Sequence, residues 1–515
     1  MAPEPKPQDA PPTGGALPAF EQVLLEHVRP TDWQNPEPRD VYDLVVVGAG
    51  TGGLVSAAIG AGLGARVALI ERDRMGGDCL NFGCVPSKGL LRASRSWAEA
   101  RASRARFGGP AVSGEGDFKA AADRMRRIRA EISSVDGADR FTSLGIDVFL
   151  GEGCFDSARS IVVDGRRLEF RRAILATGAR AAVPPIPGLD EVDYLTNASV
   201  FDLERAPERL LVLGAGAIGC ELAQAFARFG SRVTLVDMAE RVLPVEEPDA
   251  SSAVLRAFER DGVEFLGGHK IVEVGRGEGG AKRVVVEGAD GRRELEGDEV
   301  LVALGRTPNL DTGLDEAGIA YDRGGVDVDE RLRTSNSRVY AVGDVASRFQ
   351  FTHAADAQAR LAVRNALFFG RGKSGDFVIP WATYTSPEVA RVGLSAAEAA
   401  EQGVDIDTVT IDFGDVDRGR LDGDRDGFLR VHLAAGKDRI VGATIVHPHA
   451  GELIAQVTQA MTHGIGLEAL SDVVFPYPTA AEALRRAADA RKRGKLTARV
   501  SWAFEQYFRL WRRIV

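Results

Sequence analysis

Two of the chain's four cysteines lie five positions apart in the glycine-led segment GGDCLNFGCVPSK, residues 76–88. A thiol pair of this kind can alternate between disulfide and dithiol and can pass on two electrons by thiol–disulfide exchange. The CxxxxC spacing is not that of a zinc knuckle, and no second cysteine pair or nearby histidine completes four ligands, so we expect no metal site. The following segment is predicted to be a helix that begins near Cys84, where the pKa of a thiol is lowered. We therefore interpret Cys79 and Cys84 as a redox-active pair.

A dinucleotide fingerprint precedes the cysteines. The apolar run DLVVV suits a buried parallel strand, and it leads through glycines into a helical segment and a second strand that ends in Glu71. In such a unit the first glycine, Gly48, permits a tight turn, and the second, Gly50, lets the backbone approach a pyrophosphate. The third, Gly53, lets the helix pack on the strand. We expect the phosphates at the helix N-terminus and a ribose hydroxyl at Glu71.

The fingerprint occurs a second time. Gly214, Gly216 and Gly219 follow the strand RLLVLGAG, and Asp237 follows Gly216 by 21 residues, as Glu71 follows Gly50. Two complete fingerprints indicate two nucleotide-binding domains and therefore electron transfer between two cofactors, most simply from a nicotinamide to a flavin.

Three further segments fit the same plan. ILATGAR (174–180), LVALGRTPN (301–309) and VYAVGDVA (339–346) each read as a core strand that ends in a turn of small residues. Ligands of open α/β sheets bind at the carboxyl ends of strands. We expect Asp344 to be exposed at one of these ends.

Composition limits the class of protein. The chain has 515 residues, 44% hydrophobic and 27% charged, which is the balance of a soluble protein of two to four domains. No apolar run is long enough to span a membrane, and the N-terminus lacks a secretory pattern. With so few cysteines we expect a reducing, cytoplasmic compartment. The net charge of −10 argues against nucleic acid as a partner.

Together these motifs resemble the pyridine nucleotide–disulfide oxidoreductases, with the closest likeness to mercuric-reductase-like and dihydrolipoamide-dehydrogenase-like flavoproteins. The resemblance runs from about residue 42 to 490 and rests on GGDCLNFGCVPSK, the two fingerprints, ATG, GRTPN and AVGD. It implies an α/β fold with two Rossmann-like domains, one for FAD and one for NAD(P), and a C-terminal α+β dimerisation domain. It also implies a homodimer in which the partner's C-terminal domain completes each active site.

The resemblance implies roles for individual residues. Cys84 is similar to the flavin-proximal charge-transfer thiol and Cys79 to the thiol that exchanges with substrate. Lys88 and Glu221 are similar to the ion pair near the flavin ring. The remaining residues expected at the cofactors are Gly77, Thr177, Gly178, Gly305, Asp344, which holds the ribityl chain, and His353, in the segment that covers the isoalloxazine.

The expected domains follow from this plan. We predict an FAD-binding domain in two parts (41–190 and 311–379) around an NAD(P)-binding domain (191–310), and then a dimerisation domain (380–490). Residues 1–40 form an N-terminal extension, interpreted as a mostly extended arm with one short helix in AFEQVLLEHVRP. Residues 491–515 form a basic C-terminal tail.

One motif departs from the disulfide-reducing members. They have His-Pro-x-x-x-Glu where this chain has Tyr477-Pro478 and then Glu482. The pKa of a tyrosine is about 10, so Tyr477 cannot shuttle protons near neutral pH as a histidine does. Mercuric reductase also has tyrosine here, so a metal ion such as Hg(II) is the first expected acceptor. However, no cysteine follows Cys220 to deliver a metal, so a quinone or a small disulfide stays open.

The nicotinamide and the tail complete the expectations. Asp237 suits the 2′-hydroxyl of NAD, which favours NADH over NADPH, although Arg241 could offset its charge. The tail carries about +7 and the remainder of the chain about −17. Its large apolar residues recur at helical spacing (Val500, Phe504, Phe508, Trp511 and Val515, widened by Trp502, Tyr507 and Leu510). Basic and aromatic residues on one helix indicate peripheral membrane contact, and packing on the dimer is the alternative.

Two other readings compete with a metal reductase. A dihydrolipoamide dehydrogenase is weakened by Tyr477. A redox-sensing or membrane-tethered flavoprotein with little turnover would keep the same cysteine pair.

Overall fold

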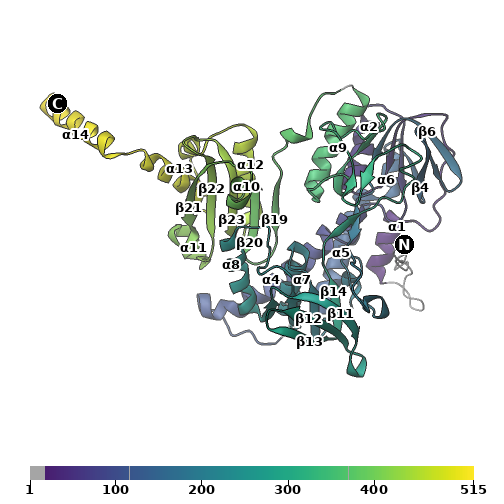
Figure 1. The fold of residues 1–515 in the computed structure, drawn as a ribbon, viewed down its shortest axis with the longest axis horizontal. Coiled ribbons are helices and arrows are strands. Elements are labelled where there is room, and N and C mark those ends of the chain that lie inside the picture. The colour runs from purple at the N-terminus through teal and green to yellow at the C-terminus, as the bar shows by residue number, and fades with distance from the viewer. Residues whose placement is uncertain (1–17, 115, 369, 515) are drawn as a thin grey trace.

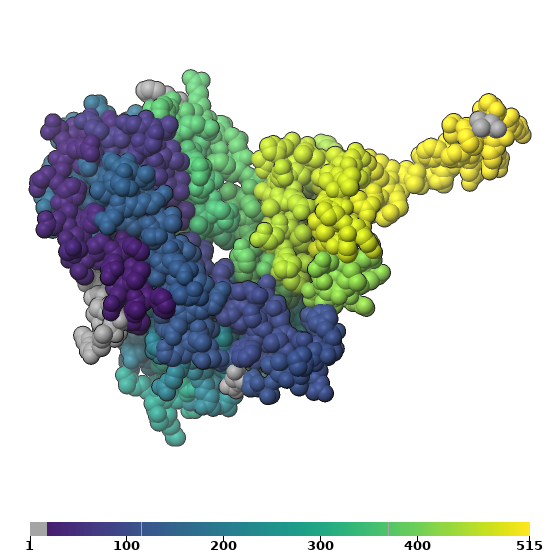
Figure 2. Space-filling view, turned by 180° about the vertical axis from the view of Figure 1, so that it is seen from behind, coloured from purple at the N-terminus to yellow at the C-terminus, as the bar shows by residue number. Residues whose placement is uncertain are grey.

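The computed structural model describes residues 18–514, apart from 115 and 369. A first, mixed sheet and a second, parallel sheet lie side by side, and a third sheet is antiparallel (Figure 1). The helix at the C-terminus projects away from the body (Figures 1 and 2). None of the helices in the described part of the chain has the length and hydropathy needed to cross a membrane.

The first sheet has the strand order β3-β2-β1-β6-β5-β4, and β18 pairs with β6. Its central strand β1 is apolar and almost wholly buried, as a strand covered on both faces must be. Helices α2 (Thr51–Gly62) and α9 (Thr352–Leu367) pack together beside it. The strands are β1 (Tyr42–Val47), β2 (Val67–Glu71), β3 (Asp147–Leu150), β4 (Gly153–Ser157), β5 (Ser160–Val163), β6 (Arg166–Leu175) and β18 (Val339–Ala341).

The second sheet is parallel, in the order β10-β9-β8-β14, and a meander of β11, β12 and β13 lies beside it. A short ladder of β7 (Ala179–Ala181) with β15 (Arg306–Pro308) connects the first and second sheets. The elements are β8 (Arg209–Leu213), α7 (Ala217–Arg228), β9 (Arg232–Val236), α8 (Pro248–Asp261), β10 (Val263–Leu266), β11 (Lys270–Arg276), β12 (Lys282–Gly288), β13 (Gly291–Gly297) and β14 (Glu299–Val302).

The third sheet is antiparallel, in the order β19-β20-β23-β22-β21. Its buried face packs against helices α12 and α13. The elements are β19 (Pro380–Thr383), β20 (Glu388–Gly393), α10 (Ala396–Glu401), β21 (Ile406–Asp412), α11 (Asp417–Asp422), β22 (Phe428–Ala434), β23 (Ile440–His447), α12 (Ala450–Thr462) and α13 (Glu482–Gly494). The predicted change from α/β to α+β near residue 380 is confirmed.

A helical layer connects these parts. α3 (Gly77–Asn81) carries Cys79, and α4 (Cys84–Phe107) begins at Cys84 and packs against α5 (Phe118–Asp136) and α7. The helix predicted after the cysteines is therefore confirmed, and it starts at the cysteine itself. α6 (Ala138–Ser143) and the small ladder of β16 (Tyr321–Asp322) with β17 (Gly325–Val326) complete the body.

The N-terminal extension differs from its prediction. Helix α1 (Ala19–Val28) forms within the predicted segment, but it packs against α5 and buries Leu24 and Val28 completely. Residues 18–40 are thus attached to the body and are not an extended arm. Residues 1–17 lie outside the described residues.

The C-terminal helix contrasts with α1. Helix α14 (Ala498–Ile514) has no buried residue, and its large apolar side chains are exposed, Trp511 by 46% and Ile514 by 75%. The predicted amphipathic helix is therefore present and is without a covering surface in the single chain.

Candidate functional site

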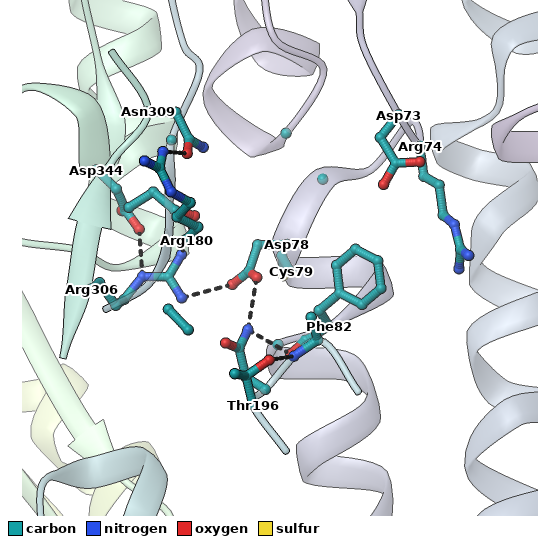
Figure 3. A pocket seen from close by; sticks show the side chains of 18 of the residues that line it. Asp73, Arg74, Asp78, Cys79, Phe82, Arg180, Thr196, Arg306, Asn309 and Asp344 are labelled. Atoms are coloured by element: carbon teal, nitrogen blue, oxygen red, sulfur yellow. Dashed lines mark hydrogen bonds and ion pairs between the residues drawn. The ribbon is translucent and has the colours of Figure 1, made fainter. Parts of the chain in front are cut away.

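A large cavity extends along the carboxyl ends of the parallel strands of the first and second sheets. It is lined by both fingerprint loops, by the turns after β6 and β14, and by the two cysteines. Figure 3 shows part of this lining, including Cys79, Arg180, Arg306 and Asp344. The topology therefore brings together the site residues predicted from segments up to residue 353.

The first fingerprint loop makes the close backbone contacts that its glycines predict. A Cβ on Gly53 would lie 1.7 Å from the carbonyl oxygen of Gly48, and one on Gly77 would lie 2.5 Å from Cα of Gly50. Helix α2 begins directly after Gly50, and no side chain caps it. Its first N–H groups are therefore available to an anion in the cavity.

The acids at the strand ends occupy equivalent positions in the two fingerprints. Glu71 accepts the N–H of Ala49 at 2.7 Å, and Asp237 accepts the N–H of Ala215 at 2.6 Å. Burial raises the pKa of Glu71. Helix α7 likewise starts after Gly216 without a side-chain cap, and a Cβ on Gly219 would lie 1.8 Å from the carbonyl oxygen of Gly214. Both loops therefore fit a dinucleotide of the expected kind.

The cysteine pair lies between the two fingerprint loops as free thiols. Cys84 is exposed, with its Sγ 3.3 Å from Oγ1 of Thr352, and Cys79 is half-buried. A hydrogen bond from Cys79 lowers the pKa of Cys84 to about 6, and Thr352 and the charge of Lys88 contribute. The same hydrogen bond, together with burial, raises the pKa of Cys79. The two thiols thus have unequal acidity, and Cys84 is the thiolate at neutral pH.

An ion pair lies next to the thiols. Nζ of Lys88 is 2.9 Å from Oε2 of Glu221 and 4.7 Å from the ring centroid of Tyr384. The other oxygen of Glu221 accepts the N–H of Tyr384 at 2.8 Å. Burial alone would lower the pKa of Lys88, but the attraction and the hydrogen bond of Glu221 outweigh it, so the pKa is raised. A fixed positive charge therefore lies on the cavity side of α4.

Arg306 is a site residue that sequence reasoning missed. Its guanidinium lies 3.2 Å from a carboxylate oxygen of Asp78 and 3.2 Å from one of Asp344 (Figure 3). Burial raises the pKa of Asp344, which is half-buried and not exposed as predicted. The motif GRTPN contains Arg306, and a cation within that motif was the available signal.

Asn309 joins two of the predicted turns. Its Nδ2 donates to the carbonyl of Thr177, and the Thr177 hydroxyl donates to the carbonyl of Asn309, both at 2.8 Å. Gly178 and Gly305 lie in the same two turns and line the cavity. His353 also lines it, with Nε2 2.6 Å from the carbonyl oxygen of Pro380 and its ring stacked on Phe351.

Two predicted residues are not brought to this cavity within one chain. Tyr477 is 71% exposed in the domain of the third sheet, and its hydroxyl donates to Asp417 at 3.0 Å. That hydrogen bond raises the pKa of Tyr477. Glu482 is buried beside Arg485, with its Oε2 unpaired among the described residues, and it does not bond Tyr477.

Within residues 18–514, leaving aside 115 and 369, no group of three or more His, Cys, Asp or Glu side chains is arranged to hold a metal ion. The cysteine side chains that line the cavity are Cys79 and Cys84.

Comparison with known proteins agrees with this geometry. The family model for "Pyridine nucleotide-disulphide oxidoreductase" matches residues 42–359, and the model for its dimerisation domain matches residues 379–488. The mercuric reductase of Staphylococcus aureus is 36% identical over 451 residues, covering 87% of this chain and 82% of that protein. The dihydrolipoyl dehydrogenase of Chlamydia muridarum is 32% identical over 455 residues, covering 86% and 95%.

Solved structures give the same result. The Cu(II) complex of RclA, an HOCl-induced flavoprotein disulfide reductase from Escherichia coli, superposes with a TM-score of 0.77 at 28% identity, over 88% of this chain and all of that one. LpdA from Mycobacterium tuberculosis superposes with a TM-score of 0.78 at 26% identity, over 87% and 99%. The matched dimerisation domain supports a homodimer. The chain belongs to the pyridine nucleotide-disulphide oxidoreductase family, whose members are FAD-dependent and take electrons from NAD(P)H.

Proposed function

We propose that this protein is an NAD(P)H:acceptor oxidoreductase that uses Cys79 and Cys84 as its redox pair, with a metal ion such as Hg(II) as the first candidate acceptor. The supporting observation is the pair of thiols in the cavity, of which Cys84 has a pKa near 6 and faces Lys88. The FAD of the family supplies the two-electron relay between nicotinamide and thiols when bound. The overall reaction would be NAD(P)H + Hg(II) → NAD(P)⁺ + Hg(0) + H⁺.

The roles of the chain's own residues follow from their positions. Cys84 provides a thiolate at neutral pH, so reduction of the Cys79–Cys84 disulfide takes up two electrons and one proton, which Cys79 holds as its thiol. Lys88, held by Glu221, places a positive charge where negative charge develops. Gly48, Gly50, Gly53, Glu71 and Gly77 are assigned to FAD. Gly214, Gly216, Gly219 and Asp237 are assigned to the nicotinamide dinucleotide.

NADH is the favoured donor. Both carboxylate oxygens of Asp237 accept backbone N–H groups, from Ala215 and Ala239, so the negative charge is held at the end of β9. Arg241 does not pair with it and donates instead to the carbonyl of Pro244. A 2′-phosphate near Asp237 would meet this negative charge.

Tyr477 favours a metal over a disulfide acceptor. Its hydrogen bond to Asp417 raises its pKa further above that of a histidine, so it is a poor proton shuttle at neutral pH. A phenol and thiolates are, in contrast, suitable ligands for a metal ion. RclA, a structural relative at 28% identity, is described as a Cu(II) complex, so Cu(II) is a second metal to test.

The test is steady-state oxidation of NADH and NADPH by the flavin-loaded dimer. Hg(II) and Cu(II) in excess small thiol, lipoamide and a soluble quinone are compared as acceptors. Cys84→Ala is the test variant, and Cys154→Ala, a half-buried cysteine in β4, is the matched control. Metal-dependent oxidation that Cys84→Ala abolishes and Cys154→Ala retains supports the proposal. Turnover on quinone alone, equal in both variants, would contradict it.

The sensor reading is separated by rapid mixing. A redox sensor would bind NADH but reduce its flavin slowly and pass no electrons to any acceptor. Flavin reduction within milliseconds, followed by repeated turnover, would exclude that reading. Lipoamide turnover comparable to that with the metals would instead favour the dihydrolipoamide dehydrogenase alternative.

We further infer peripheral membrane contact through the tail, residues 491–515. Within α14, residues at 100° spacing place Ala503, Phe504, Tyr507, Phe508, Leu510, Trp511 and Ile514 on one continuous face. Four arginines, Arg499, Arg509, Arg512 and Arg513, lie on the opposite face and form no ion pair among the described residues. An apolar face with aromatic residues and a basic reverse side suits the surface of an anionic bilayer.

Trp502 is an exception to the predicted face. It precedes Trp511 by nine residues, or two and a half turns, and therefore lies on the basic side and does not widen the apolar face.

The two tryptophans form a matched pair. Trp511→Gln should weaken sedimentation with vesicles of phosphatidylglycerol and phosphatidylcholine about tenfold, and Trp502→Gln by less than about twofold. Equal effects of the two variants would indicate that the helix packs on a second copy. The same conclusion would follow if the protein did not bind vesicles and the variants changed its dimerisation.

A further inference from the structure

The cavity wall contains residues that precede the matched family region. The match begins at residue 42, yet Arg29, Trp33, Gln34 and Asn35 line the same cavity as Glu71. We propose that residues 18–37 are part of the FAD site at its adenosine end and slow the release of the cofactor. The proposal rests on the FAD dependence of the family and is independent of the identity of the acceptor.

Helix α1 is fixed to the segment that carries the cysteines. The side chain of Glu21 pairs at 2.5 Å with Arg129, which is completely buried and donates to the carbonyl of Asn81 at 2.9 Å. Asn81 ends α3, which contains Cys79. At the end of α1, the carbonyl of Val28 accepts the N–H of Met75 at 3.0 Å. The position of α1 is therefore tied to residues 75–81.

Arg29 holds the turn that follows the acid at the strand end. Its guanidinium donates to the carbonyls of Arg72 and Asp73 at 2.7 and 2.6 Å. These are the two residues after Glu71, whose carboxylate is expected at the ribose. Arg29 therefore braces the turn next to the ribose subsite without occupying the pyrophosphate subsite at α2.

Asn35 closes the next part of the same edge. It donates to the carbonyl of Leu150 at 3.0 Å and accepts the N–H of Leu150 at 2.7 Å. Leu150 ends β3, which is parallel to β2 and lies on the side away from β1. The segment therefore runs from the end of β2 to the end of β3, along the edge where ligands of such sheets bind.

Trp33 lies between these two anchors. It packs partly on the core of the first sheet and also lines the cavity. Its indole N–H is buried and has no hydrogen-bond partner among the described residues. The indole face offers a stacking surface for a base.

The charged side chains along this wall favour the adenosine half of FAD over a different ligand at this place. Within the described part of this wall, Arg29 is directed to backbone carbonyls, and Arg39 pairs with Asp147 outside the cavity lining. Between those arginines the wall presents the indole of Trp33, the amides of Gln34 and Asn35 and the carboxylate of Glu37, and it presents no cation for a phosphate, so it suits a base and sugar. The pyrophosphate would remain at the N-terminus of α2.

The test measures FAD release from the purified holoprotein by the recovery of flavin fluorescence after dilution. Arg29→Gln and Trp33→Ala are the test variants. Arg39→Gln is the matched control, because it alters a nearby arginine that does not line the cavity. We expect the dissociation rate to rise at least about fivefold in both test variants and to stay within about twofold in the control.

A second measurement localises the effect. AMP competes with FAD for rebinding to the apoprotein through its adenosine half alone. AMP should compete less well with Trp33→Ala than with the control variant, while circular dichroism shows equal folding. Unchanged FAD release in both test variants, or an equal change in Arg39→Gln, would overturn the proposal. Because no acceptor or nicotinamide is added, either result leaves the redox proposal to its own test.

Discussion

Two helices lie outside the matched family regions, α1 near the N-terminus and α14 at the C-terminus. The first packs on the body, whereas the second is exposed. Helix α1 buries Leu24 and Val28 and pairs Glu21 with a buried arginine. Helix α14 has the clearer division into apolar and basic faces, yet none of its described residues is buried. Amphipathic pattern alone therefore does not tell which terminal helix belongs to the body. Specific partners on the body decide this.

Removing each terminus in turn gives the largest expected effect. Deletion of residues 1–40 should release most of the bound FAD and lower the melting temperature, because the anchors at Arg129 and Leu150 lose their partners. Deletion of residues 497–515 should leave both properties unchanged. Flavin absorbance after gel filtration and thermal unfolding measure the two. FAD loss in the C-terminal deletion, or no FAD loss in the N-terminal deletion, would contradict the conclusion that α1 belongs to the body and α14 does not.

Replacing one carboxylate in each helix tests how firmly that helix is attached to the body. Burial lowers the pKa of Arg129, and Glu21 is the counter-charge that opposes this. Glu21→Ala leaves a buried cation without its partner and should reduce the free energy of unfolding by about 3 kcal/mol. Glu505→Ala in α14 removes an exposed charge and should change it by less than about 0.5 kcal/mol. Chemical denaturation followed by circular dichroism measures both variants. Equal values would mean that α1 is no more firmly attached than α14.

The smallest expected effect of the two deletions is on the pKa of Cys84. The pKa of Cys84 is lowered to about 6, so its reactive thiolate fraction should rise from about a tenth at pH 5 to about nine tenths at pH 7. Alkylation of the reduced protein by iodoacetamide, followed by mass spectrometry, gives this profile. Neither deletion should shift its midpoint, because the residues that lower the pKa, Cys79, Thr352 and Lys88, lie in the body. Replacing the donor by Cys79→Ala should raise the midpoint.

The sequence predicted well the features that depend on local chemistry. The two fingerprints, their acids at the strand ends and the helix that begins at Cys84 each follow from residues close together in the chain. The Lys88–Glu221 pair joins residues far apart, and it was expected only because a known family carries it. The fold class is confirmed, whereas the residue roles at the cofactors stay predictions.

What the sequence could not provide are contacts between distant segments without a motif. Glu21 and Arg129 are 108 residues apart, and nothing in either neighbourhood indicates their pairing. Arg306 stood inside a recognised motif, but its two carboxylate partners come from other segments. The hydrogen bond from Tyr477 to Asp417 likewise joins two separate segments, and no motif indicates it.

The central claim is that electrons from the nicotinamide reach the cysteine pair. The direct measurement is a count of titratable thiols per chain in the oxidised, flavin-loaded protein, before and after one equivalent of NADH without oxygen. We predict two additional thiols per chain, and none in Cys84→Ala. A flavin that is bleached by NADH while the thiol count of the native protein stays unchanged would contradict the account.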